Sequence, residues 1–447
     1  MHSPCLFILI IIPIIPKVML FHFFGVPILL DDFALAFAVG LGLIHILTRA
    51  SVTGSCKLMI SQAGVLFCAF ALYKTIDFGI LSLAYPWTDQ SRIGHGVIVG
   101  EGTLVLSKTL AFVFVYIITF SSLRSWDTII HALKLHLFSV IIVVVIGLIQ
   151  LFVLGHGQLT STFRNIHALS IQVPGWGVDD PWFANVAVGH EHLGAYMVLA
   201  VSILGGVLFF GYPANRLKSN MMTILWIACL ITLVFASSRG AWIGGACSLM
   251  MFAGLALKGG QFSRLLFIVF VSICSLTICE WILDLGIVEH VENRIGGLLS
   301  FFSYNYKLED DSALNRIGVY NTLWGIFKNH FILGLGAGAA GRIAEGQLIR
   351  ELVEGGVIGG SLFLILMIIS GKIAFKTIHT ARAPLAQGVS FGFVCGLVGL
   401  FGQSFFTELF ILTKIGTPFW VMAAIVHRLY TINPPTDTLF YESATVG

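Results

Sequence analysis

Three arginines could hold an anion, and the first of them stands where apolar and polar sequence meet. Arg239 lies between two apolar runs, and burying a guanidinium there is costly unless it has a partner or a function. Its planar group can bind an anion through two parallel hydrogen bonds. A snorkelling arginine or an ion pair at a helix end would explain the same position, so both interpretations stay open. Arg316 and Arg342, further along the chain, could reach the same anion.

Acidic residues downstream could carry acid/base chemistry. Glu345 and Glu354 lie nine residues apart, with Arg350 between them. Glu345 and Arg350 could bracket a polar cleft. A carboxylate at an apolar boundary is either kept neutral by desolvation or kept ionised by a nearby arginine, and either state suits proton transfer. A solvated amphipathic segment with no chemistry is the alternative.

A second polar stretch carries aromatic and histidine residues. Trp182 stands among other aromatics and carboxylates, a combination that can hold a sugar but that also fits an interfacial aromatic belt. The next apolar run opens with Gly-His-Glu-His. Because residues one or two apart on a helix do not face one point, a metal site is not expected here. His190 and His192 are instead predicted to form the polar lip of an outward-facing cavity.

Composition places these residues in a membrane protein. The 447-residue chain is 57% hydrophobic and 11% charged, against about 25% charge in soluble domains, and its mean hydropathy is +0.94. The apolar runs recur at membrane-spanning length, so we expect an all-α polytopic membrane protein. The eight cysteines lie in or beside apolar runs without C-x-x-C spacing. Neither a disulfide framework nor a metal site is predicted, and no basic cluster indicates nucleic-acid binding.

About twelve transmembrane helices fit the apolar pattern. The first is expected to be retained, because no small-residue cleavage site accompanies it. Lys and Arg gather in alternate short loops, which predicts that both termini are cytoplasmic. The approximate ranges of the spans are 5–24, 33–47, 58–83, 97–120, 134–154, 187–211, 221–237, 240–257, 264–283, 357–375, 388–407 and 410–430.

These spans divide the chain into six parts. They are the N-terminal helices (1–154), a first outward-facing loop (155–186), the central helices with Arg239 (187–283), a large outward-facing loop (284–356), the C-terminal helices (357–430) and a cytoplasmic tail (431–447). Charge is concentrated in the large loop. An amphipathic helix is expected there after Asp310, lying on the membrane surface. The chemistry is expected in this loop.

Four motifs, in this order, resemble the O-antigen ligase/polymerase family of bacterial inner-membrane proteins. The resemblance covers about residues 185–430, and the first 180 residues add only a compatible hydropathy pattern. The motifs are Ser237–Gly240, Asn315–Arg316 with Trp324, Gly334–Gly338 and Glu345–Gly359.

The resemblance implies a metal-independent membrane glycosyltransferase of the glycosyltransferase C-like class, with no cofactor. Its large periplasmic loop would contain short helices and act on glycans linked to undecaprenyl diphosphate. The family's two arginines match Arg239 and Arg316, and the position where its ligases typically carry a histidine is Glu345. These three are the expected catalytic residues. The residues expected to bind substrate are Trp182, His190, His192, Arg342, Arg350 and Glu354.

Three functions stay open at this point. Glutamate in place of histidine at Glu345 favours a polymerase that joins lipid-linked repeat units into O-antigen or exopolysaccharide. A ligase that transfers a finished glycan to lipid A core, and so completes lipopolysaccharide, is the alternative. A secondary transporter is the third, because Lys74, Glu101 and Lys108 lie inside apolar runs. For the first two, the resemblance implies a chain-length regulator and a flippase as neighbours in the bilayer.

Overall fold

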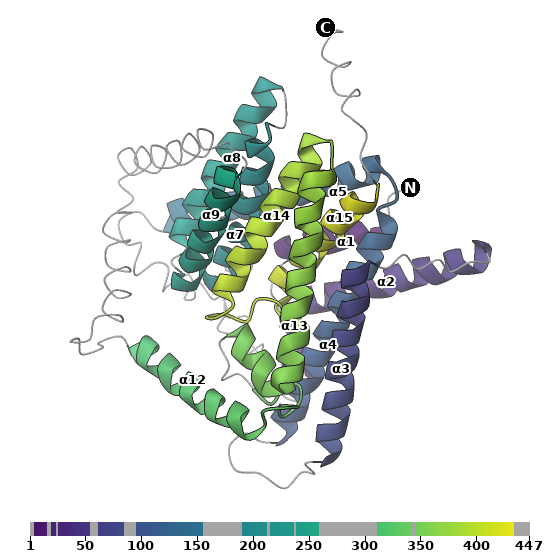
Figure 1. Ribbon diagram of the computed structural model, residues 1–447, viewed down its shortest axis with the longest axis vertical. Coiled ribbons are helices and arrows are strands. Elements are labelled where there is room, and N and C mark those ends of the chain that lie inside the picture. Colours follow the sequence, from purple (N-terminus) through teal and green to yellow (C-terminus); the bar gives the residue numbers. More distant parts are fainter. Residues whose placement is uncertain are drawn as a thin grey trace.

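The computed structural model describes residues 4–15, 19–23, 26–53, 61–84, 95–154, 190–211, 215–236, 238–258, 311–340 and 346–432. These residues are almost entirely helical (Figure 1). Seven of the helices among them are long and apolar enough to cross a membrane, judged by length and composition. The expected class, a helical multi-pass membrane protein, is therefore confirmed, whereas the count of about twelve spans stays a prediction.

Most of the predicted spans coincide with single helices. The predicted span 264–283 lies outside the described residues, as does the predicted loop 155–186. The long helices are α2 (Leu30–Thr53), α3 (Gln62–Ala84), α4 (His95–Ser122), α5 (Trp126–Leu154), α7 (His190–Phe209), α8 (Arg216–Phe235), α9 (Arg239–Lys258), α12 (Asp311–Asn329), α13 (Gln347–Thr380), α14 (Pro384–Gln403) and α15 (Thr413–Ile432).

The predicted first span, 5–24, is wrong as a single helix. Helix α1 (Pro4–Ile11) runs into the short 3-10 helix η1 (Ile12–Ile14), and strand β1 (Met19–Phe23) then pairs antiparallel with β2 (Val26–Leu29). Pro13 lies in the first turn of η1. A proline lacks the backbone donor that an α-helix needs at this position, so the apolar run cannot continue as one helix.

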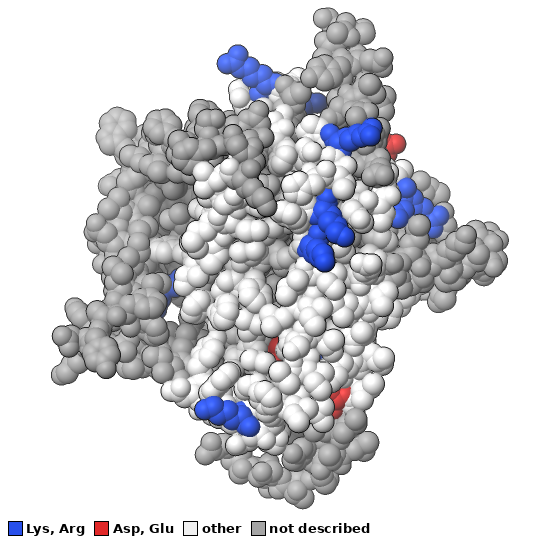
Figure 2. All heavy atoms as spheres, in the orientation of Figure 1, with Lys and Arg blue, Asp and Glu red and all other residues white. Residues whose placement is uncertain are grey.

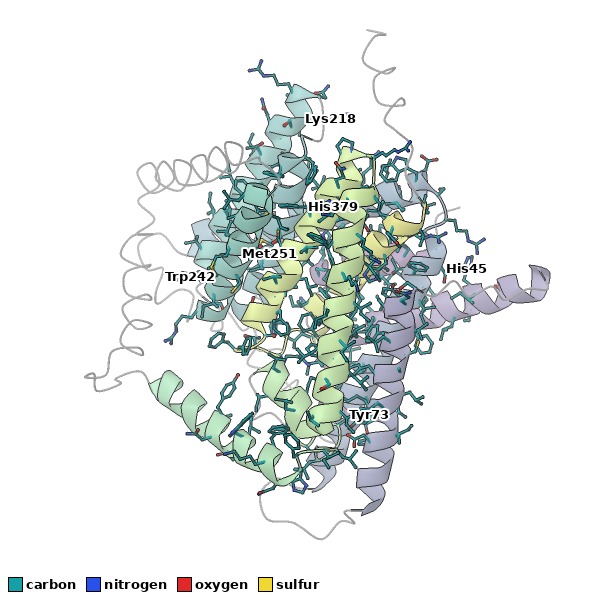
Figure 3. The ribbon with its side chains drawn as sticks, viewed as in Figure 1. His45, Tyr73, Lys218, Trp242, Met251 and His379 are labelled. Carbon is teal, nitrogen blue, oxygen red and sulfur yellow. The ribbon has the colours of Figure 1, made fainter. Side chains whose placement is uncertain are left out.

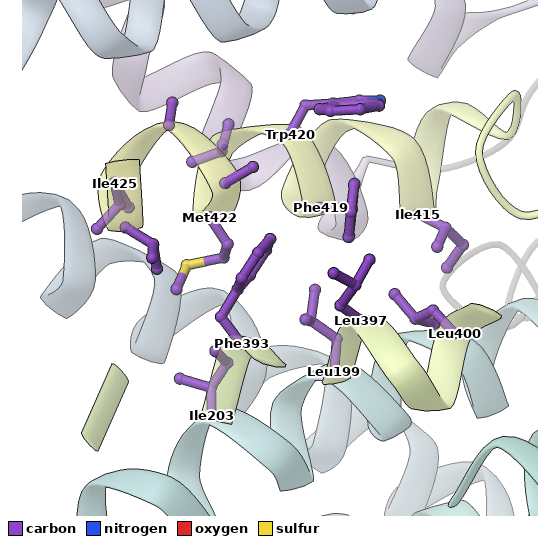
Figure 4. Packing of buried hydrophobic residues seen from close by; sticks show 14 of the residues in the cluster. Leu199, Ile203, Phe393, Leu397, Leu400, Ile415, Phe419, Trp420, Met422 and Ile425 are labelled. Carbon is purple, nitrogen blue, oxygen red and sulfur yellow. The ribbon is translucent and has the colours of Figure 1, made fainter. Parts of the chain in front are cut away.

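Helix α14 lies at the centre of the bundle, with α7 and α9 packed on one side of it and α13 on the other (Figure 1). It approaches α7 so closely that a Cβ added at Gly206 would lie 2.4 Å from the Gly388 carbonyl oxygen. Small residues allow such close packing of helices in a membrane. Larger side chains fill the space toward α15, where the rings of Phe393 and Phe419 stack with centroids 5.5 Å apart (Figure 4).

Helix α13 is two helices joined at Gly356. Its 34 residues would extend about 51 Å as one helix, well beyond the roughly 30 Å core of a bilayer. Gly356 breaks it with a non-helical φ of 59° and ψ of −161°. The part after the break agrees with the predicted span 357–375. The part before it is a short helix that the sequence placed in the polar loop.

The segment 331–338 runs beside this break and satisfies its backbone. The Leu335 N–H donates to the Val353 carbonyl at 2.9 Å, and the Val357 N–H donates to the Phe331 carbonyl at 2.8 Å. Irregular backbone within a membrane protein needs such partners, because lipid offers none. The segment 331–338 therefore holds the two halves of α13 in a fixed relation.

Positive charge is uneven along the bundle. Figure 2 shows most of the visible Lys and Arg toward one end of the helices, and Lys218 lies at that end, opposite Tyr73 (Figure 3). Arg124 and Arg382, in the connections before α5 and α14, are exposed as well. This basic end is the one that the positive-inside rule assigns to the cytoplasm. The cytoplasmic location of both termini stays a prediction.

Replacing Gly356 by alanine is expected to destabilise the protein. The added Cβ would lie 2.3 Å from the Ile332 carbonyl oxygen, and a backbone conformation that essentially only glycine adopts costs a side chain about 1–3 kcal/mol. The melting temperature measured in detergent should therefore be lower than that of the wild type. Gly325→Ala in α12 is the matched control, because nothing lies within 4 Å of its added Cβ, and it should be neutral or slightly stabilising. Equal melting temperatures for both variants would contradict this account of the break.

Candidate functional site

The segment Gln403–Glu408, which follows α14, joins elements that carry the predicted catalytic residues. The Gln347 N–H, at the start of α13, donates to the Ser404 carbonyl at 2.8 Å. The Tyr320 hydroxyl of α12 donates to the Phe405 carbonyl. Through these bonds the segment fixes α12 and the first turn of α13 against the end of α14.

The start of α9 lies against the same segment. Ser238 favours the start of the helix at this point, because its hydroxyl accepts a hydrogen bond from the Ala241 N–H at 3.2 Å. Arg239 is the first residue of α9 and is partly buried. A Cβ added at the following Gly240 would lie 3.3 Å from the Cβ of Phe406. Arg239 therefore belongs to the region where α9, α12 and α13 converge.

The first turn of α7 joins this region from another side. His190 begins α7, and the His192 side chain is partly buried. Two residues later, a Cβ added at Gly194 would lie 2.4 Å from the Cβ of Ala241, so α7 and α9 touch near their first turns. In the described part of the chain, no three His, Cys, Asp or Glu side chains are grouped as metal ligands.

Of the other predicted residues, one lies in a described helix and three lie outside the described residues. Arg316 lies in α12, one helical turn before Tyr320. Trp182, Arg342 and Glu345 lie outside the described residues. In the sequence, Glu345 directly precedes Gly346, the N-cap of α13.

Arg350 and Glu354 belong to a buried charge network, which we define as Lys74, Arg350, Glu351, Glu354 and Glu408. The Lys74 Nζ lies 2.7 Å from Glu351 Oε2 and 3.1 Å from Glu354 Oε2. The Arg350 Nη1 lies 2.9 Å from Glu354 Oε1, and its Nε lies 2.5 Å from Glu408 Oε1. The network thus links α3, the first half of α13 and the Gln403–Glu408 segment.

Glu354 is the centre of the network, and its side chain has 0% exposure. Besides Lys74 and Arg350, it accepts a hydrogen bond at 3.1 Å from the Gly338 N–H. Next to it, the Tyr73 hydroxyl of α3 donates to the Gly355 carbonyl at 2.7 Å. The carboxylate therefore binds three separate parts of the chain at the point where α13 breaks.

Gln347 continues the same polar contacts toward the candidate site. Its side-chain Nε2 donates to Glu351 Oε1 at 2.8 Å, and its Oε1 accepts from the Phe410 N–H at 3.2 Å. The backbone N–H of Gln347 already binds the segment that follows α14. Gln347, in the first turn of α13, thus connects the network with the Gln403–Glu408 segment.

The network changes how two predicted residues are understood. Arg350 and Glu354 were expected to bind substrate or to lie in a solvated segment, and the structure buries both with protein partners. They hold the first half of α13 in place, and direct binding of substrate by them stays a prediction. Sequence reasoning missed Glu351, Glu408 and the pairing of Lys74. A lysine in an apolar run signals a buried counterion, but no local pattern links α3 to α13.

Comparison with known proteins identifies no relative, so function is argued from the motifs and the geometry. No family model matches the chain, and no curated protein matches it. The convergence of α7, α9, α12 and α13 is therefore the observation from which function is argued.

Replacing Lys74 by methionine is expected to destabilise the protein by about 3–5 kcal/mol, because breaking a buried ion pair leaves its partner charge without compensation. Here two carboxylates, Glu351 and Glu354, would lose their lysine. Urea or thermal unfolding in detergent would measure the loss. Lys328→Met on exposed α12 is the control and should stay within about 0.5 kcal/mol of wild type.

The double variant Lys74→Met with Glu351→Gln separates charge from packing. Removing one carboxylate together with the lysine should recover part of the lost stability, because less uncompensated charge remains. If the loss of stability in the double variant equals the sum of the losses in the two single variants, the two residues are not electrostatically coupled.

Proposed function

We propose that this protein is a polymerase that joins undecaprenyl-diphosphate-linked oligosaccharide units at the periplasmic face of a bacterial inner membrane. The product would be O-antigen or exopolysaccharide. The observation that carries the proposal is the convergence on the Gln403–Glu408 segment. It supports a single site for Arg239, Arg316 and Glu345, which lie far apart in the sequence.

The chemistry of the proposed reaction suits these three residue types. A hydroxyl of the acceptor sugar attacks the anomeric carbon of the donor, and the bond from that carbon to the diphosphate oxygen breaks. Glu345 accepts the proton of the attacking hydroxyl. Arg239 and Arg316 stabilise the charge that collects on the departing undecaprenyl diphosphate. Guanidinium groups can do this without a metal ion.

The buried network supports the proposal by supplying rigidity. A catalytic group must be held within about 0.5 Å of its working position by packing and by further hydrogen bonds. Glu345 stands two residues before Gln347, whose backbone and side chain are both bonded to the protein. The network anchors the same short helix through Arg350 and Glu354.

A ligase would use the same site and differ in its acceptor, so it remains the first alternative. The transporter alternative loses part of its basis, because Lys74 pairs with Glu351 and Glu354, and Lys108 lies 3.1 Å from Asp32 Oδ1. One observation still favours it. Asp77 of α3 is buried, and its Oδ2 has no hydrogen-bond partner within the described residues, which is a feature of proton-coupled carriers.

Cells that lack this protein should lose long surface polysaccharide while single repeat units remain attached to lipid A core. Separation of the polysaccharide by size would show this directly, and the wild-type gene should restore long chains. Polymer accumulating on undecaprenyl diphosphate, with none on the core, would identify a ligase instead. An unchanged profile would argue against both. Complementation with Glu345→Gln tests the base, because full restoration would exclude that role for Glu345.

Replacing Arg239 by lysine is expected to slow polymerisation by about 100- to 1,000-fold, the usual effect of losing one group that stabilises developing charge. Lysine keeps the charge but cannot form two parallel bonds to a phosphate. The assay follows turnover of purified lipid-linked donor by reconstituted protein. Arg382→Lys, exposed at the basic end, is the control and should keep wild-type turnover. A fully active Arg239→Lys protein would mean that the arginine is structural.

A further inference from the structure

An apolar cavity lies near the basic end of the bundle, far from the site proposed above. It has a volume of about 110 Å³, is partly open, and is lined by α5, α7, α8 and α14. Its walls include Leu137, Val140, Ile203, Leu204, Met222 and Val389. An apolar cavity of this scale can accept an apolar ligand. The hydrocarbon chain of a lipid is the apolar ligand that surrounds a membrane protein.

One polar group lines this cavity without a partner. The His136 side chain is 5% exposed, and its Nε2 forms no hydrogen bond within the described part of the chain. Its ring meets that of Tyr196 edge to face, with centroids 6.2 Å apart. A buried polar atom left unsatisfied is costly, so a ligand that hydrogen-bonds Nε2 would gain free energy. A purely apolar ligand would leave the ring nitrogen unsatisfied.

One cation lines the cavity, and two more stand in the sequence close to residues that line it. Lys134 lines it directly and is exposed. Lys218 stands one turn before Met222 on α8, and Arg382 stands three residues before Leu385 at the start of α14. The one acidic residue in the first turn of α5 is Asp127, two turns before Lys134. The entrance therefore favours a negatively charged headgroup.

The order of these groups along α5 matches the order of groups along a glycerophospholipid. Lys134 comes first, His136 follows, and Val140 lies about 9 Å beyond Lys134 along the helix axis. We propose that the cavity binds an anionic glycerophospholipid from the surrounding bilayer. The phosphate lies at Lys134, an ester carbonyl accepts a hydrogen bond from His136, and part of one acyl chain fills the cavity. This site does not depend on the polymerase proposal.

Native mass spectrometry of the purified full chain tests the site with phosphatidylglycerol and phosphatidylcholine of identical acyl chains. Wild-type protein should retain phosphatidylglycerol in preference. Lys134→Gln should weaken phosphatidylglycerol binding about fivefold, the effect of one cation near an anionic headgroup, and should leave phosphatidylcholine binding unchanged. Lys376→Gln, an exposed lysine of α13 that does not line the cavity, is the matched control.

A large side chain placed in the cavity tests whether an acyl chain occupies it. Val140→Trp should abolish retention of both lipids, whereas Val145→Trp, on the exposed surface of the same helix, should not. His136→Phe keeps the ring and removes the hydrogen bond, so it should weaken both lipids. If Val140→Trp does not fold, Lys134→Gln and His136→Phe decide the question. Equal retention of the two lipids by wild type, or equal effects of Lys134→Gln and Lys376→Gln, would overturn the proposal.

Discussion

A carboxylate removed from water must find charged or hydrogen-bonding partners that replace the lost solvation, or it costs several kcal/mol. Glu354 is in this situation, and its partners come from three parts of the chain: Lys74 of α3, Arg350 of α13 and the backbone N–H of Gly338. If one of these parts moved, a charge would stay buried without compensation. The arrangement around the break in α13 is therefore strongly specified.

This constraint is transmitted to the candidate site through an ion pair and the short segment that carries one of its partners. Arg350 holds Glu408, and Glu408 ends the segment that touches α9, α12 and the first turn of α13. A glycosyl transfer that depends on arginines from separate helices needs such a common support. Four of the five side chains in the network are buried, and Glu408 is 17% exposed, which suits a supporting role. The residues proposed for the chemistry lie instead at helix starts and in the polar sequence beside them.

Hydropathy was sufficient to place many of the single helices. The predicted ranges from 33–47 to 240–257 each correspond to one helix between α2 and α9. It failed where an apolar run contains a local exception, as at Pro13, or where a polar stretch is buried by partners from elsewhere. Arg350, Glu351 and Glu354 look like a solvated helix face in sequence. Their partners Lys74, Glu408 and the Gly338 N–H explain their burial, and these pairings depend on tertiary contacts.

Helices α7 and α14 connect the two ends of the molecule. Their packing therefore determines how a lipid bound at the basic end can affect the candidate site. Both line the cavity near that end, and at the other end α7 touches α9 while α14 leads into Gln403–Glu408. Gly206 and Gly388 bring their backbones into direct contact, so a larger side chain at either position would force the two helices apart. A lipid in the cavity would contact both helices of this pair. It would therefore stabilise the pair and, through it, the support of the candidate site.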